Sequence, residues 1–239
     1  MITKKPLYKT AITGSRKVGL SLVGDFLKRH QRVAVIDLEA IPPELFAGPQ
    51  FTDIDEWTGQ TVVTTNATHA ALRQEFGSDL VDMINGPINR DKLAARINGN
   101  PGRMRKYNSI MHQGIRNRMT QKLDLVKAAI AFVLVPFLFE HKMRDQFNEA
   151  WCVICQHSIQ IQRIMNVEGV TAQEAQVLID KHWTQVTKAR KSNYVINNSG
   201  DPANTYAQIL GLLPQALKRA RAFSRAQAPP STPSTSSAA

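Results

Sequence analysis

Short apolar segments alternate with amphipathic ones along most of the chain. Residues 7–13 and 32–37 are short, apolar and rich in β-branched side chains, and residues 18–30 between them have apolar residues at helical spacing. Short continuous apolar runs are typical of strands that are buried in a parallel sheet. The same pattern returns at residues 129–135, 151–155 and 194–196. Five such strands separated by helical stretches predict a doubly wound α/β fold.

Two further segments do not belong to this alternation. Residues from about 66 to 125 have a mostly helical pattern that is broken at Gly77 and at Asn100-Pro101-Gly102, which predicts an inserted helical subdomain. The segment 227–239 is rich in Ser, Pro and Ala, and we expect this low-complexity tail to be disordered in isolation. We therefore assign residues 1–226 to one domain.

The composition limits the class of protein. The chain has 239 residues, of which 43% are hydrophobic, so it can form one sizeable core. Its longest apolar run, residues 128–139, is too short to span a bilayer. The two cysteines, Cys152 and Cys155, exclude a disulfide-stapled secreted scaffold and fit a reducing intracellular compartment. Because they lie within a strand pattern, we interpret them as buried side chains rather than metal ligands.

Charge is distributed unevenly. The formal net charge of +11 implies polyanionic partners, although residues 37–56 contain six carboxylates and no basic residue. The segment 87–123 contains nine basic residues and one acid, Asp91. We expect this segment to face a large protein or ribonucleoprotein assembly, with RNA as one possible partner. The side chains expected to make these contacts are Arg96, Arg103, Arg105, Lys106, Arg116 and Arg118.

The turn after the first strand is similar to a phosphate-binding loop. That loop has the pattern G-x-x-x-x-G-K-[ST], because its glycines let backbone N–H groups surround the phosphates and its hydroxyl holds Mg²⁺. Gly14, Gly19 and Ser21 stand at this spacing, but Leu20 occupies the position of the lysine. An ordinary glycine-containing turn explains the pattern about equally well. Asp37, at the end of the second strand, is where a catalytic carboxylate would stand beside such a loop.

Further motifs follow in the order of one enzyme family. They are V-I-D-L-E at 35–39, N-G-P-I-N-R at 85–90, H-Q-G-I at 112–115, P-F-L-F-E at 136–140, Q-I-Q-R at 160–163, E-G-V-T at 168–171 and I-N-N-S-G at 196–200. With the loop, they resemble dephospho-coenzyme A kinases, the P-loop kinases that phosphorylate the ribose 3′-hydroxyl in the last step of coenzyme A synthesis. Order and spacing hold over about residues 7–215, and the chain is identified as a member of that family.

The resemblance carries expectations about fold and site. It implies a five-stranded parallel sheet of order 2-3-1-4-5 with lid helices at about 158–190. It also implies ATP and Mg²⁺ as cofactors, and dephospho-CoA as the substrate if the enzyme is active. The implied catalytic residues are Asp37 and Arg163. The implied nucleotide-binding residues are Gly14, Lys17, Gly19 and Ser21, with Ser21 holding Mg²⁺, and the implied substrate-binding residues are Glu39, Arg90 and His112.

Three positions depart from the family pattern. Leu20 replaces the lysine that contacts the β- and γ-phosphates, Val167 replaces a second lid arginine, and Gln113 replaces a proline. Lys17 or Arg16 offers a substitute cation from the loop itself. The residues alone give His112 and His182 only structural roles, because no Cys/His cluster is nearby in the sequence.

Two functional hypotheses remain from the sequence. The loss of two cations favours a catalytically impaired kinase-like protein that serves as a structural or binding subunit of a larger complex. By analogy with enzymes recycled as subunits of mitochondrial assemblies, we favour the mitochondrion as its location, and otherwise the cytoplasm. The alternative is an active dephospho-CoA kinase that transfers the ATP γ-phosphate to the ribose 3′-hydroxyl.

Overall fold

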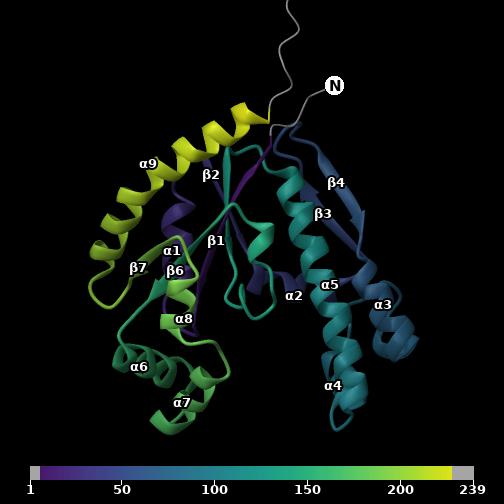
Figure 1. The fold of residues 1–239 in the computed structure, drawn as a ribbon. Coiled ribbons are helices and arrows are strands. Elements are labelled where there is room, and N and C mark those ends of the chain that lie inside the picture. The colour runs from purple at the N-terminus through teal and green to yellow at the C-terminus, as the bar shows by residue number, and fades with distance from the viewer. Residues whose placement is uncertain (1–5, 228–239) are drawn as a thin grey trace, which may run out of the picture.

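The computed structural model describes residues 6–227 and contains a five-stranded parallel sheet (Figure 1). Its strands are β1 (Tyr8–Gly14), β2 (Val33–Asp37), β5 (Ile130–Leu134), β6 (Glu149–Ile154) and β7 (Tyr194–Asn197). They lie in the order β2-β5-β1-β6-β7, which is 2-3-1-4-5 when only these five strands are counted. The predicted fold class and strand order are confirmed. The expected tail lies outside the described residues, except for Gln227.

Helices cover both faces of the sheet. Ile130, Phe132 and Leu134 pack with α1 (Leu20–Leu27) and α9 (Pro202–Ala226) on one face. Ala131 and Val133 pack with α2 (Ile41–Ala47), α3 (Ala67–Phe76) and α5 (Pro101–Leu125) on the other. All five β5 residues are buried, which is why the strand is continuously apolar instead of alternating.

A two-stranded antiparallel sheet stands apart from the main sheet, and the sequence analysis did not predict it. It pairs β3 (Gln50–Ile54) with β4 (Thr61–Thr65). Phe51 is buried, whereas its neighbours Gln50 and Thr52 are exposed, which is the alternation of a half-buried strand. The carboxylates of the acidic segment 37–56 obscured this signal.

Helices α3, α4 (Arg90–Ile97) and α5 occupy most of the segment in which an inserted helical subdomain was expected. The 25-residue helix α5 packs against α2, α3 and α4. Gly114 lets α5 approach α3 closely, because a Cβ at this position would overlap the side chain of Thr68. Short 3₁₀ turns connect the elements at Leu38–Ala40 (η1), Ser78–Leu80 (η2) and Arg144–Gln146 (η3).

Three helices follow β6 in the region expected to form the lid: α6 (His157–Glu168), α7 (Ala172–Asp180) and α8 (Gln185–Arg190). Gly169 ends α6 in the left-handed conformation (φ 66°) that glycine adopts without strain. Thr171 and Glu174 then form a capping box that starts α7. Among residues 6–227, no helix combines the length and apolar character that crossing a membrane requires.

Candidate functional site

The loop between β1 and α1 borders a cavity of about 360 Å³ at the carboxyl ends of the sheet strands. Gly19, with φ of 103°, precedes α1, and no side chain caps the N-terminus of this helix. The backbone N–H groups of its first turn therefore lack side-chain acceptors at a helix end that carries positive potential. The other residues lining this loop cavity are Ser15, Arg16, Lys17, Leu20, Ser21, Glu39, Pro136, Phe137, Arg163, Val167 and His182.

Two cations beside the loop are held by other protein groups. Arg16 forms a bidentate ion pair with Glu168 at the end of α6, with N···O distances of 2.9 and 2.7 Å. Arg163 donates to the carbonyl oxygens of Val18 (3.2 Å) and Asn198 (3.0 Å), so that α6 is bonded to the loop. Lys17 is exposed and, within the described part of the chain, has no ion pair or hydrogen bond. Lys17 is thus the loop cation that is free to meet an anion.

The two departures from the family pattern leave uncharged side chains in this cavity. Leu20 is only 9% exposed and belongs to the core that packs beneath α1. Val167 is 65% exposed at the cavity wall. Neither side chain can neutralise phosphate charge. Ser21 is exposed in the same cavity, so its hydroxyl is available to a ligand or a metal ion.

A second cavity, of about 290 Å³, adjoins the first. Glu39, Pro136 and Phe137 line both cavities and therefore mark their junction. Burial, with the nearby charge of Asp37, raises the pKa of Glu39, and Lys17 and Arg16 partly offset this rise. The other side chains around this junction cavity come from α5 and from the segments after β2 and β5: Leu38, Pro42, Tyr107, Asn108, Met111, His112, Ile115, Arg116, Val135, His141 and Met143.

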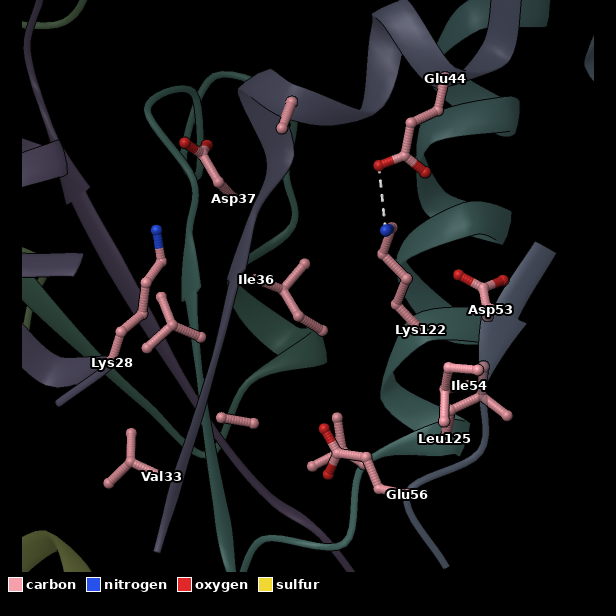
Figure 2. A pocket seen from close by; sticks show the side chains of 14 residues that line it. Lys28, Val33, Ile36, Asp37, Glu44, Asp53, Ile54, Glu56, Lys122 and Leu125 are labelled. Atoms are coloured by element: carbon pink, nitrogen blue, oxygen red, sulfur yellow. Dashed lines mark ion pairs between the residues drawn. The ribbon is translucent and has the colours of Figure 1, made fainter. Parts of the chain in front are cut away.

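The structure does not bring Asp37 into either of these cavities. Its carboxylate accepts a hydrogen bond from the backbone N–H of Glu39 (2.9 Å) and caps the 3₁₀ turn after β2. Asp37 instead lines a third cavity, between the free edge of β2 and strand β3, as Figure 2 shows. Glu39, two residues later, is the carboxylate of this motif that faces the loop.

Of the two other expected substrate-binding residues, one lies in the junction cavity. His112 lines its wall from α5. Arg90, at the start of α4, is exposed and its guanidinium lies 5.1 Å from the ring centroid of Phe46. Arg90 itself does not line the cavity. Its charge partly offsets the rise that burial causes in the pKa of Tyr107, which lines the cavity wall.

The expected partner-facing set is corrected at Arg118. Its side chain is only 4% exposed, bonds both carboxylate oxygens of Asp53 (2.6 and 2.7 Å) and reaches Glu44 at 2.8 Å. Its guanidinium also lies 4.0 Å from the ring centroid of Phe51. Arg118 therefore anchors β3 to α5 and cannot contact a partner.

The rest of that set is divided between internal contacts and solvent. Arg96 pairs with Asp79 at 2.5 Å and donates to the Phe76 carbonyl, so it secures the turn after α3. Lys106 pairs with Glu75 at 3.5 Å. Arg103 and Arg105 are exposed, and Arg103 donates to the carbonyl oxygen of Arg96. The half-buried Arg116 donates to the side-chain oxygen of Gln113.

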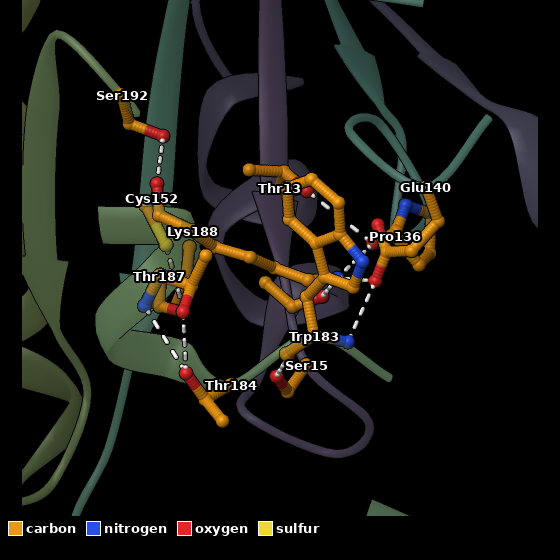
Figure 3. A network of polar contacts seen from close by, with 12 residues as sticks. Thr13, Ser15, Pro136, Glu140, Cys152, Trp183, Thr184, Thr187, Lys188 and Ser192 are labelled. Carbon is orange, nitrogen blue, oxygen red and sulfur yellow. Dashed lines mark hydrogen bonds and ion pairs between the residues drawn. The ribbon is translucent and has the colours of Figure 1, made fainter. Parts of the chain in front are cut away.

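Sequence reasoning missed a buried cation beneath the loop. Lys188 of α8 is fully buried, and its ammonium group bonds Pro136 O (2.6 Å), Gly14 O (3.2 Å) and Glu140 Oε1 (2.8 Å). Figure 3 shows this Lys188 network. In addition, Glu140 accepts from the Trp183 N–H (3.0 Å), and the Trp183 carbonyl accepts from the Ser15 hydroxyl (3.0 Å). The network thus joins the loop, the end of β5 and the lid.

A stack of rings, also missed, runs along both cavities. The Phe137 ring stacks on His182 (centroids 4.5 Å apart) and on His141 (5.2 Å). His141 in turn contacts His112, with centroids 4.5 Å apart. These histidines are far apart in the sequence, so no local sequence motif predicted that they lie together. Burial lowers the pKa of both His141 and His182.

The donors present fit a nucleotide with Mg²⁺ better than a protein-held metal. Within residues 6–227, no group of three or more His, Cys, Asp or Glu side chains is placed to bind a metal ion. Mg²⁺ usually binds through few protein ligands and through substrate phosphates, and Ser21 and Glu39 supply such oxygens at the loop cavity. Cys152 and Cys155 are buried, and burial raises the pKa of Cys152 to about 11, as expected for structural cysteines.

Comparison with known proteins agrees with this geometry. A family model described as dephospho-CoA kinase matches residues 44–204. A dephospho-CoA kinase of Geobacillus kaustophilus is 30% identical over 166 residues, which cover 68% of this chain and 82% of that protein. Another, from Shouchella clausii, is 26% identical over 208 residues, covering 86% of this chain and 96% of that protein.

Solved structures show the same fold. The protein TT1252 from Thermus thermophilus aligns with a TM-score of 0.66 at 19% identity, covering 88% of this chain and 98% of that one. A dephospho-CoA kinase from Campylobacter jejuni aligns with a TM-score of 0.59 at 18% identity over the same shares. Sequence, fold and family match together show that this chain belongs to the dephospho-CoA kinase family.

Proposed function

We propose that this chain binds ATP in the loop cavity and dephospho-CoA in the junction cavity, and that it transfers the γ-phosphate to the ribose 3′-hydroxyl only slowly. The observation that carries this proposal is that the two cavities meet at Glu39, Pro136 and Phe137. Phosphoryl transfer requires the donor phosphate and the acceptor hydroxyl to meet in line, and adjoining cavities provide this arrangement.

The residues around the junction have distinct parts in this reaction. Lys17 and the first-turn N–H groups of α1 hold the phosphate chain, and Mg²⁺ held by Ser21 would neutralise phosphate charge. Glu39 faces both ligands, and its raised pKa suits a group that takes the proton of the acceptor hydroxyl. His112 and Tyr107 line the wall on which the acceptor lies.

Slow transfer follows from Leu20 and Val167. Neither supplies the positive charge that stabilises a transferring phosphoryl group, and removal of one such contact costs on the order of a hundred- to a thousandfold in rate. The family match covers residues 44–204 and thus leaves out the loop with Leu20, whereas Val167 lies within the matched range. Binding rests on different groups from transfer, so we expect binding to survive.

Binding and transfer are tested separately. ATP or ADP at a hundred times its Kd should stabilise the protein by about 2.7 kcal/mol in thermal or chemical unfolding. Formation of CoA from dephospho-CoA should in the same preparation be far below the turnover of about 1–100 s⁻¹ that is usual for kinases. Absence of any nucleotide effect on unfolding would refute the binding site, and ordinary turnover would refute the impairment.

A subunit role is the second proposal, and one observation favours it. Arg103 and Arg105, at the start of α5, are exposed and lack an acidic partner among the described residues. They are the part of the basic segment that is open to an assembly or to RNA. Burial of Arg118 and the ion pair of Arg96 make this surface smaller than the sequence indicated.

A further inference from the structure

His182 lies at the wall of the loop cavity, in the short segment between α7 and α8. Its ring stacks on Phe137 with centroids 4.5 Å apart and planes 18° apart. The next residue, Trp183, is bonded through its N–H to Glu140 and through its carbonyl to the Ser15 hydroxyl. These contacts hold the imidazole beside the loop, in the cavity that Gly19 and Ser21 also line.

The imidazole has unused hydrogen-bonding capacity. His182 Nδ1 is buried and has no hydrogen-bond partner among the described residues, and the same holds for Glu140 Oε2. The other oxygen of this carboxylate accepts from Trp183 N–H and from Lys188, which places Oε2 close to the segment that carries His182. Buried polar atoms without partners are rare, and two of them next to one cavity are groups that a ligand or a proton can satisfy.

The charges that face His182 come from several elements. Lys188 of α8 and Arg16 of the loop lower its pKa after burial has done so, while Glu140 acts in the opposite direction. Lys17, Arg163 and Glu39 line the same cavity. The pKa of His182 is therefore lowered in the free protein, which favours the neutral ring, and a bound polyphosphate would shift the balance toward its charged form.

We propose that His182 binds the phosphate chain of the nucleotide and takes up a proton from solvent when it does so. This inference rests on the proposed nucleotide site. The imidazolium supplies in the loop cavity a positive charge that Leu20 does not, and its buried Nδ1–H gains Glu140 Oε2 as an acceptor. Phe137 supports the ring by stacking, where the family motif has leucine.

Proton uptake has a measurable sign. The pKa of His182 rises on binding, so affinity increases as pH falls from above the bound-state pKa to below the free-state pKa. The gain is at most tenfold per pH unit between these two values. The terminal phosphate of the nucleotide also titrates near pH 6, so the difference between wild type and a matched variant isolates the proton uptake that depends on the histidine.

The experiment is calorimetric titration of the full chain with ADP in two buffers of different ionisation enthalpy, between pH 5.5 and 8. We expect the wild type to take up more protons per ADP than His182→Gln, and His30→Gln, whose ring packs on Phe26 at the end of α1 away from the loop, to match the wild type. In parallel, imidazole NMR of the wild type should show the His182 pKa rising when pyrophosphate is added.

The outcomes separate the two proposals. Equal proton uptake in wild type and His182→Gln, with ADP still bound and the His182 pKa unmoved by pyrophosphate, overturns the role of His182 and leaves the nucleotide site standing. Failure of ADP and pyrophosphate to bind at any pH in this range overturns both. A rise in pKa seen by NMR supports the role even if His182→Gln is unstable.

Discussion

The ammonium group of Lys188 lies 2.8 Å from Glu140 Oε1, beneath the loop that precedes α1. Lys188 comes from α8 and Glu140 from the segment after β5, and the same ammonium also bonds the carbonyl oxygens of Gly14 and Pro136. One buried cation thus fixes three segments that meet at the loop cavity. All three of these bonded oxygens belong to the protein, so this lysine cannot serve as the missing phosphate-binding cation.

Substitution of Lys188 by methionine should destabilise the protein by about 3–5 kcal/mol, because the Glu140 carboxylate is left buried without its partner. Chemical denaturation measures this loss. Lys181→Met, at an exposed position at the end of α7, is the matched control and should change stability by no more than about 0.5 kcal/mol. The double variant Lys188→Met/Glu140→Gln should regain part of the loss, since no buried charge remains. An effect of Lys188→Met as small as that of the control would contradict the role assigned to this pair.

Arg118→Ala should destabilise the protein by about 3–5 kcal/mol at pH 7, because Asp53 loses its partner on the inner side of β3 and Glu44 keeps only Lys122. Exposed Arg105→Ala is the control and should be nearly neutral in its effect on stability.

The contribution of Arg118 to stability should depend on pH. The hydrogen bonds from Arg118 lower the pKa of Asp53, so this stabilisation is present above the unfolded-state pKa of about 3.9 and is lost as pH falls below it. Denaturation from pH 7 to pH 3 should show the difference between wild type and Arg118→Ala shrinking below about pH 4. A difference that stays constant over this range would mean that the Asp53 contact contributes nothing.

Restoring the two missing cations should restore transfer. We expect Leu20→Lys/Val167→Arg to form CoA from ATP and dephospho-CoA on the order of a hundredfold faster than the wild type. The control is Leu20→Met/Val167→Met, which alters side-chain shape without adding charge and should leave the rate low. If the charged variant binds ATP but gains no rate, causes other than these two positions limit the reaction.

Lys17→Ala should weaken ADP binding about tenfold or more, because a charged hydrogen bond to phosphate contributes roughly 1.5–3 kcal/mol. Lys181→Ala removes an equal charge away from the loop cavity and should leave the Kd within about twofold, consistent with a weak long-range effect. Titration calorimetry at fixed salt measures both constants. Equal Kd values for the two variants would exclude Lys17 as a phosphate contact.

The proposed subunit role predicts a partner that binds the start of α5. The variant Arg103→Ala/Arg105→Ala/Lys106→Ala should bind polyuridine RNA less tightly than the wild type, with a shallower dependence of log K on log salt. Arg221→Ala/Arg225→Ala on α9 is the control for a loss of charge elsewhere. Recovery of the native protein as a free monomer, without retention on RNA or on an acidic protein, would remove support for this role.

The fold could be predicted because the strands of the main sheet are buried on both faces and are therefore apolar along their whole length. The strand order needed the resemblance, since five similar strands do not specify their neighbours. The hairpin of β3 and β4 was missed because its inward face includes Asp53, a carboxylate that only its pairing with Arg118 makes compatible with burial.

At the site, local motifs located the loop and Glu39 but not the groups that complete the cavities. Arg118 was misassigned because its charge was counted without its helical phase: Met111, Gly114 and Arg118 share the buried face of α5 at i, i+3 and i+7 spacing. The phase of the helix would have revealed it. Lys188 and His182 had no such signal, because their partners at Glu140 and Phe137 are brought to them only by the tertiary fold.

The direct bonds between loop and lid determine how fast a nucleotide enters and leaves. Arg16 pairs with Glu168, and Gln160 donates to the Arg16 carbonyl at 2.7 Å, so this conformation holds α6 against the loop. If a nucleotide enters by moving α6 away from the loop, these bonds must break, and the measured affinity is lowered by the fraction of molecules in which they are intact. Once the nucleotide is inside, the same bonds reform and delay its escape. Slow association and long residence are the expected kinetic signature, and Glu168→Gln should accelerate both entry and release in stopped-flow measurements.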